Sequence, residues 1–107
     1  GRRPGDASVW QGYAQCLHSQ GQPRDAEQAF KRALQVNPAH VPSIASYAAF
    51  LHSVKRDVGG AKLLYTRALQ LDPAHSASLC NYGMLQEEVY GDYEHARTLY
   101  ESALSTD

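Results

Sequence analysis

Residues 33–40 of the chain read ALQVNPAH, and residues 68–75, 35 positions later, read ALQLDPAH. In both stretches an apolar segment of helical character runs into Asn-Pro or Asp-Pro. Proline disfavours helical geometry in the residue before it, so a helix has to end there and the chain has to turn. We interpret this stretch as the joint between consecutive copies of a helical repeat.

Small and aromatic residues recur along most of the chain with the same period. The sets that return every 34 or 35 residues are Tyr13-Ala14, Tyr47-Ala48 and Tyr82-Gly83; Ala26, Ala61 and Ala96; Phe30, Tyr65 and Tyr100; and Ala33, Ala68 and Ala103. A period of this length is typical of helical solenoids, in which stacking buries the apolar faces that a single hairpin leaves exposed. We predict three repeats, at about residues 7–40, 41–75 and 76–107, after a linker or cloning remnant at residues 1–6.

Each copy predicts two amphipathic helices. In the first copy, apolar side chains at i, i+3, i+4 and i+7 mark one helix face: Trp10, Tyr13, Ala14 and Leu17. The first helix is predicted over about residues 7–20, and Pro23 opens the second, which ends near Val36. The turn between the two helices is one residue longer in the second and third copies, and Asp92 is predicted to cap the last helix.

The pattern Trp10-x2-Tyr13-Ala14-x2-Leu17, Ala26-x3-Phe30-x2-Ala33 and Pro38 resembles the tetratricopeptide repeat (TPR) over nearly all of residues 7–107. The resemblance implies an all-α fold: an α-solenoid of three antiparallel helix-turn-helix repeats, wound as a right-handed superhelix and belonging to a longer array. The aromatic residues Phe30, Tyr65 and Tyr100 are expected to fill the gap between the two helices of each repeat. Residues 90–101, YGDYEHARTLYE, are also similar to the half-a-TPR (HAT) repeats of RNA-processing scaffolds.

Composition and motifs narrow the class of function. The 107 residues are 43% hydrophobic and 20% charged, which fits one globular domain. We find neither a membrane span nor a signal peptide in the sequence, so we expect an intracellular, cytoplasmic protein. Cys16 and Cys80 lie two repeats apart and are expected to be free thiols. The sequence has no glycine-rich phosphate loop, nucleophile motif or paired catalytic carboxylates, so we predict a protein without enzymatic activity or cofactor.

The resemblance implies that the first helices of the repeats form a concave wall on which protein partners bind. The side chains expected on this wall are Gln11, Gln15, His18, Ser46, Ala49, His52, Cys80, Asn81 and Met84. Small and mostly uncharged side chains of this kind could accept an extended peptide through amide hydrogen bonds, or let an amphipathic helix lie close over the alanines. The alternative is that this wall is only solvated and that the binding site lies on repeats outside the sequence.

Family members that hold the C-terminal carboxylate of chaperone peptides use Lys, Arg and Asn side chains on the same wall, because charge-assisted hydrogen bonds to a carboxylate are strong. The matching positions in this chain carry no cation: they are Gln11, Gln15, Ser46, Ala77 and Asn81. We therefore predict a protein or peptide partner but no carboxylate clamp.

Metal ions and RNA are two further classes of ligand on which the sequence bears. His18, His52 and Glu87 hold the same place in successive repeats, but helix axes 8–10 Å apart and the absence of zinc-ligand spacings argue against a metal site. The histidines His40 and His75 are expected to be turn residues at the joints. An RNA-processing or RNA-binding role remains the alternative function, although the net charge of −1 disfavours contact with a phosphate backbone.

Charge is distributed unevenly between the two ends of the chain. Basic and acidic side chains number five and three in residues 1–40, four and two in residues 41–75, and one and six in residues 76–107. We expect the last helix to expose an apolar face with Leu99, Ala103 and Leu104. Thr106, where the earlier copies have an aliphatic residue, makes this face less hydrophobic. Opposite charge at the two ends predicts weak head-to-tail self-association.

Overall fold

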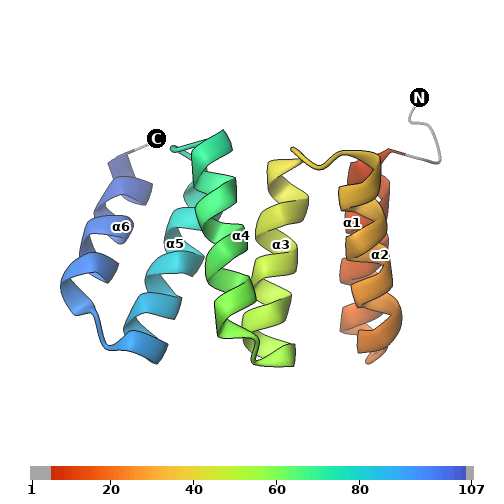
Figure 1. Cartoon of the computed structure of the whole chain (residues 1–107), viewed down its shortest axis with the longest axis horizontal. Helices are drawn as coiled ribbons and strands as arrows, with labels where there is room; N and C mark the ends of the chain where they lie inside the picture. The colour runs from red at the N-terminus through yellow and green to blue at the C-terminus, as the bar shows by residue number, and fades with distance from the viewer. Residues whose placement is uncertain (1–5, 106–107) are drawn as a thin grey trace.

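A computed structural model describes residues 6–105 of the chain, which fold into three helical hairpins arranged in one row (Figure 1). The elements are α1 (Ala7–Ser19), α2 (Pro23–Val36), α3 (Val41–Phe50), the π-helical turn η1 (Leu51–Lys55), α4 (Val58–Leu71), α5 (Ser76–Leu85), the π-helical turn η2 (Gln86–Tyr90) and α6 (Tyr93–Ser105). We call α1, α3 and α5 the A helices and α2, α4 and α6 the B helices. The all-α solenoid predicted from the sequence is confirmed.

Three of the helices, α1, α4 and α6, begin after an aspartate whose side chain accepts a backbone hydrogen bond. The Asp6 carboxylate accepts from the Ser8 N–H at 2.8 Å, and the Asp92 carboxylate accepts from the His95 N–H at 3.1 Å, which confirms the predicted cap of α6. Such a cap satisfies a donor that the first helical turn leaves free. Asp6 is therefore the N-cap of α1, at the end of the segment 1–6 that is predicted to be a linker, and residues 1–5 of that segment lie outside the described residues.

The additional residue in the second and third repeats is accommodated by a π-helical turn at the end of the A helix. In η1 and η2 the chain ends the helix with i to i+5 geometry, and a residue in the left-handed region follows each turn: Arg56 with φ 56° and Gly91 with φ 62°. The first repeat has no such turn, and α1 passes to α2 through Gly21 with φ 76°. What the sequence indicates as a longer loop is in the structure a lengthened helix end.

The two copies of the repeated stretch, residues 33–40 and 68–75, form the same joint between repeats. Asn37 and Asp72 each accept, through a side-chain oxygen, the N–H of the residue two positions on. The ring Nδ1 of His40 lies 2.6 Å from the Ser43 hydroxyl, and that of His75 lies 2.7 Å from the Ser78 hydroxyl. Both serines are fully buried, so the histidines satisfy hydroxyl groups that would otherwise lack a partner. The prediction that these histidines act as local turn residues is confirmed.

The core is continuous across the repeats because aromatic rings of the B helices stack on tyrosines of the following A helices. The rings of Phe30 and Tyr47 lie 5.6 Å apart at 14°, and those of Tyr65 and Tyr82 lie 5.8 Å apart at 22°. Phe30 and Tyr65 are almost completely buried as a result. Stacked aromatic pairs contribute beyond the apolar area that they bury, so these contacts join the hairpins into one unit.

The two ends of the row differ from the sequence expectation. Tyr13, predicted on the buried face of its helix, is 54% exposed because no B helix precedes α1 among the described residues. At the other end Leu99 and Ala103 are buried in the core cluster that contains Leu79, Tyr82 and Leu85 of α5, and of the three residues expected to be exposed there only Leu104 is exposed, at 77%. Thr106 lies outside the described residues. Among residues 6–105, no helix has the length and hydropathy that crossing a membrane requires.

Candidate interaction surface

One side of the A helices carries two adjoining hollows, and we call this surface the A-helix face. The first hollow, of about 190 Å³, lies between α1 and α3 and is lined by Gln15, His18, Phe30, Ser46, Ala49, Phe50 and Ser53. The second, of about 300 Å³, lies between α3 and α5 and is lined by Ala49, His52, Ser53, Arg56, Tyr65, Asn81, Met84 and Glu88. Ala49 and Ser53 border both hollows, so the two form one stepped surface.

The structure brings most of the predicted wall residues together on this face. Seven of the nine line one or both hollows: Gln15, His18, Ser46, Ala49, His52, Asn81 and Met84. Gln11 lies beside the first hollow, where it contacts Ser46, whereas Cys80 is an exposed free thiol that lines neither hollow. Cys16 is likewise exposed and unpaired, as predicted.

The amide groups of the first repeat are already engaged in holding α1 to α3. The Gln11 side chain donates to the Ser46 hydroxyl at 2.9 Å and to the Pro42 carbonyl at 3.2 Å, and Gln15 donates to the same hydroxyl at 3.2 Å. A ligand that uses these groups would exchange such bonds or add to them through the amide carbonyl oxygens. Hydrogen bonds at exposed positions exchange at low cost, because water already competes for them.

The two hollows differ in the residue that forms their floor. Phe30 lies beneath the first hollow, and Tyr65, its equivalent in the next repeat, lies beneath the second. Tyr65 is only 1% exposed, and its hydroxyl makes no hydrogen bond with any described residue. Burial raises the pKa of this phenol above its ordinary value, so it remains a neutral donor. The second hollow therefore offers a phenol donor that the first one lacks.

Sequence reasoning missed Tyr65 as a residue of this face because it assigned the position to the core. The residue does both, since its ring packs on Tyr82 while its hydroxyl end reaches the hollow. The available signal was the exchange of Phe30 for a tyrosine at an otherwise equivalent core position. An added hydroxyl at such a position requires either a partner or access to solvent.

Charged groups of the second hollow stand at its rim. His52 Nε2 lies 3.5 Å from Glu88 Oε2, and Arg56 stands at the turn that follows η1. The neighbouring Glu87 points elsewhere and accepts a hydrogen bond from the Tyr100 hydroxyl at 3.0 Å. The row of His18, His52 and Glu87 considered in the sequence analysis thus does not form, and residues 6–105 contain no group of three His, Cys, Asp or Glu side chains placed to hold a metal ion.

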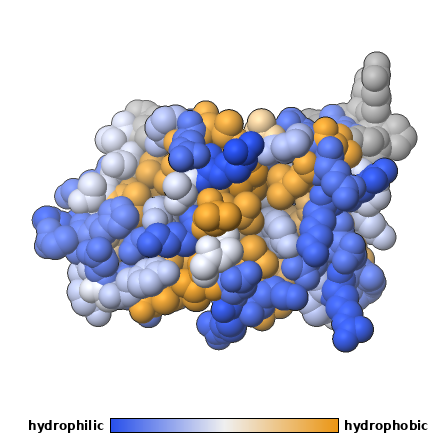
Figure 2. All heavy atoms as spheres, in the orientation of Figure 1, coloured by the Kyte–Doolittle hydropathy of each residue, from blue (hydrophilic) through white to orange (hydrophobic). Residues whose placement is uncertain are grey.

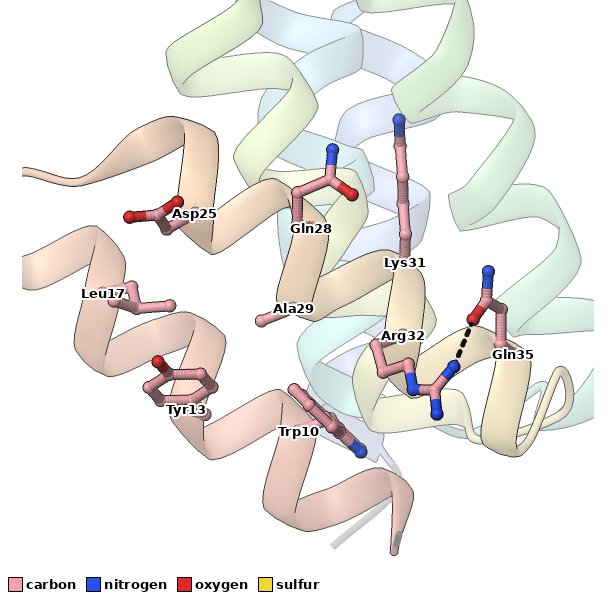
Figure 3. Close-up of a pocket in the computed structure, with 9 residues that line it drawn as sticks. All are labelled: Trp10, Tyr13, Leu17, Asp25, Gln28, Ala29, Lys31, Arg32 and Gln35. Atoms are coloured by element: carbon pink, nitrogen blue, oxygen red, sulfur yellow. Dashed lines mark hydrogen bonds between the residues drawn. The ribbon is translucent and has the colours of Figure 1, made fainter.

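A further hollow, of about 490 Å³, opens between α1 and α2 at the N-terminal end of the row and contains none of the predicted site residues (Figure 3). Trp10, Tyr13 and Leu17 of α1 face Ala29 and Arg32 of α2 across it. The Arg32 guanidinium lies 5.8 Å from the Trp10 ring centroid, and the indole N–H is buried without a partner among the described residues. We call this surface, with Asp25, Gln28, Lys31 and Gln35 at its border, the N-terminal end surface.

Comparison with known proteins identifies both a family and a fold. The family model of the cilia and flagella-associated protein 70 middle TPR-like domain matches residues 2–107. A search of curated proteins finds no match to the chain.

Three solved structures share the fold at low sequence identity. The second TPR of Spaghetti (RPAP3), bound to the HSP90 peptide SRMEEVD, superposes with a TM-score of 0.82 at 18% identity, over 95% of this chain and 93% of that one. The first TPR of the same protein, bound to the same peptide, gives 0.83 at 17% identity, over 95% and 79%. MamA gives 0.80 at 16% identity, over 95% and 58%.

Proposed function

The chain belongs to the family of the cilia and flagella-associated protein 70 middle TPR-like domain, and we propose that it is a non-enzymatic scaffold that binds a segment of another protein on its A-helix face. The observation that carries this proposal is the pair of adjoining hollows, which run across all three A helices and end on the unpartnered hydroxyl of Tyr65. Two TPR domains of one protein, both of the same fold as this chain, were solved with a peptide bound, which supports a peptide as the class of ligand.

The shape and chemistry of the hollows favour an extended peptide. A volume of about 300 Å³ is at the lower limit of small-molecule sites, so the second hollow suits one side chain better than a cofactor. Asn81 and Gln15 stand one in each hollow and offer amide groups to a peptide backbone. A polar side chain of the peptide would enter the second hollow and accept a hydrogen bond from Tyr65.

We do not propose that the peptide is held by its C-terminal carboxylate. The positions at which related clamps carry cations hold Gln11, Gln15, Ser46, Ala77 and Asn81 in this chain. Arg56 is the sole Lys or Arg among the described residues that line the two hollows. One arginine is also a poor match for RNA, because binding to a phosphate backbone draws on several cations.

Affinity capture with charged substitutions tests this proposal. The double variant Gln15→Arg/Ala49→Arg places two guanidinium groups in the hollows, and Leu63→Arg places one on the exposed outer side of α4, where Leu63 is 74% exposed. Immobilised wild type and both variants are incubated with an extract of ciliated cells, and the captured proteins are identified by mass spectrometry. We expect specific partners to be lost with the double variant and retained with Leu63→Arg.

A set of partners unchanged by the double variant would contradict binding at the A-helix face. Direct titration of the chain with mixed single-stranded RNA serves as the second arm. Tight binding that weakens steeply as the salt concentration rises would favour the HAT-like RNA role over the peptide scaffold.

A further inference from the structure

The two internal joints, by which we mean here the packing interfaces between successive repeats, have the same construction. In each, an aromatic ring of a B helix stacks on the tyrosine of the next A helix, as Phe30 does on Tyr47 and Tyr65 does on Tyr82. A polar contact accompanies each stack at equivalent positions. Glu27 pairs with Lys55 at 3.1 Å in the first joint, and the Lys62 ammonium lies 5.1 Å from a tyrosine ring centroid in the second.

Each end of the row presents one half of such a joint. At the N-terminal end surface, Tyr13 holds the position of Tyr47 and Tyr82 but is 54% exposed. At the other end, Tyr100 on α6 holds the position of Phe30 and Tyr65, is only half-buried, and has no ring stacked on it among the described residues. The same helix exposes 77% of Leu104. The ends are therefore complementary in the same sense as the surfaces of the internal joints.

The depth of the N-terminal end surface has a local cause. Ala29 stands where α4 and α6 carry Leu64 and Leu99, so α2 leaves space that the later repeats fill with a larger side chain. Trp10 and Tyr13 wall this space on the α1 side (Figure 3). A branched apolar side chain brought by another molecule would fill it and remove apolar surface from water.

We propose that the N-terminal end surface binds helix α6 of a second copy of this chain, with Tyr100 stacked on Tyr13 and Leu104 inserted between α1 and α2. This contact uses neither hollow of the A-helix face and is independent of the proposed function. It is heterologous, so copies join head to tail and the row of hairpins continues from one molecule into the next.

Charge favours this orientation over the reverse one. Helix α6 carries Glu94 and Glu101 against one cation, Arg97, whereas Lys31 and Arg32 border the N-terminal end surface against one carboxylate, Asp25. Figure 2 shows hydrophilic side chains gathered over these two ends of the row, with apolar ones exposed between them. Opposite charges at the two ends steer unlike ends together and hold like ends apart. Because one end helix is a small contact area, the association is weak.

The test is a complementation experiment in the analytical ultracentrifuge. Tyr13→Arg blocks the N-terminal end surface while keeping its basic character, and Leu104→Glu blocks α6 while keeping its acidic character. Both residues are exposed, and circular dichroism verifies that each variant folds. Wild type is expected to assemble as its concentration rises from about 0.02 to about 1 mM. Each variant alone is expected to associate at least about tenfold more weakly.

An equimolar mixture of the two variants distinguishes head-to-tail contact from other modes. One variant keeps an open N-terminal end surface and the other keeps an open α6, so the mixture is expected to form dimers and no larger species. Assembly of wild type should weaken as salt rises from about 0.05 to about 0.5 M, because screening shortens to a few ångströms. Leu63→Glu, an equally exposed leucine of α4, should assemble like wild type.

Three results would overturn the proposal. A wild-type chain that is monomeric at every concentration leaves the N-terminal end surface to a different occupant. A variant that dimerises by itself as strongly as wild type would show contact between like ends. Assembly of wild type that strengthens with salt would exclude the attraction between the acidic and basic ends.

Discussion

At the scale of single residues, Tyr65 unites the core and the candidate site. Its ring is held between α3 and α5 by the stack on Tyr82, and its hydroxyl reaches the second hollow of the A-helix face. A phenylalanine would serve the packing alone, as Phe30 does at the equivalent position. The hydroxyl is thus the part of the residue that the fold does not require, which makes it the group most open to use by a ligand.

Two substitutions at this residue should separate packing from the hydroxyl. Tyr65→Ala removes a buried aromatic ring and should lower the free energy of unfolding by about 3–5 kcal/mol. Tyr65→Phe loses no hydrogen bond to a described residue and should change it by less than about 1 kcal/mol. Urea denaturation followed by circular dichroism measures both. If Tyr65→Ala unfolds at the same urea concentration as wild type, the residue is not the core anchor that its burial implies.

At the scale of elements, the π-helical turns set the geometry of the second and third repeats. Each turn absorbs one additional residue and then needs a left-handed residue to leave the helix. Gly91 adopts that conformation at no steric cost, whereas Arg56 carries a Cβ atom into a region that L-residues avoid. The second repeat therefore holds backbone strain immediately beside the hollow that His52 and Arg56 line.

Exchanging glycine and non-glycine residues at these two positions should give effects of opposite sign. Arg56→Gly should raise the free energy of unfolding by up to about 1 kcal/mol, because it relieves the left-handed conformation. Gly91→Ala should lower it by about 1 kcal/mol, although an added Cβ has no neighbour within 4 Å and meets no steric obstacle. Urea midpoints of the two variants test this, and effects of the same sign would show that the turns are not strained in the way the φ angles indicate.

At the scale of the whole molecule, Tyr47 couples the two halves of the core. One cluster of buried residues lies around Phe30 and Phe50, and the other runs from α3 to α6 around Tyr65 and Tyr82. Tyr47 packs against both clusters, and its hydroxyl donates to Glu27 of α2 at 2.8 Å. We therefore expect the three hairpins to unfold as one cooperative unit.

Two tyrosines of the core, Tyr47 and Tyr65, make the stability of the folded molecule sensitive to alkaline pH. Burial raises the pKa of Tyr47, with the Glu27 carboxylate adding to the effect, and burial alone raises that of Tyr65. In the unfolded chain both phenols lose their protons near pH 10, whereas the folded chain retains them. The folded state then binds more protons than the unfolded state, so the free energy of unfolding falls as the pH rises above about 10 and is unaffected by these groups below about 9.

Urea midpoints compared between about pH 8 and about pH 11 measure this loss. The double variant Tyr47→Phe/Tyr65→Phe lacks both phenols, and its midpoint should depend less on pH than that of wild type. Phenolate absorbance of the wild-type chain should show that only part of the seven tyrosines titrates before unfolding. Titration of all seven in a chain that is still folded would contradict the assignment of the two buried phenols.

The sequence by itself determined the repeat, its helices and the side of each A helix that lines the hollows. These follow from periodicity, because residues three and four apart share a helix face and a 34- or 35-residue period repeats that face in successive hairpins. Most of the predicted wall residues therefore line the A-helix face. The ALQ-x-N/D-P-A-H sequence likewise determined the joints, since a proline and a capping side chain act on the neighbouring backbone and need no distant contact.

Only the tertiary structure decided how deeply each side chain is buried and which neighbour it faces, because both depend on residues that are distant in the sequence. Tyr65 and Phe30 are alike in periodicity, and only the packing of adjacent helices leaves one with a hydroxyl in a hollow. Glu88 rather than Glu87 meets His52, because each residue of a helix is turned by about 100° from the last and the residue added by a π turn changes which one faces the neighbour. Tyr13 is exposed and Leu99 buried for the same reason: burial is set by the helix that packs against a residue, not by the residue's place in the repeat.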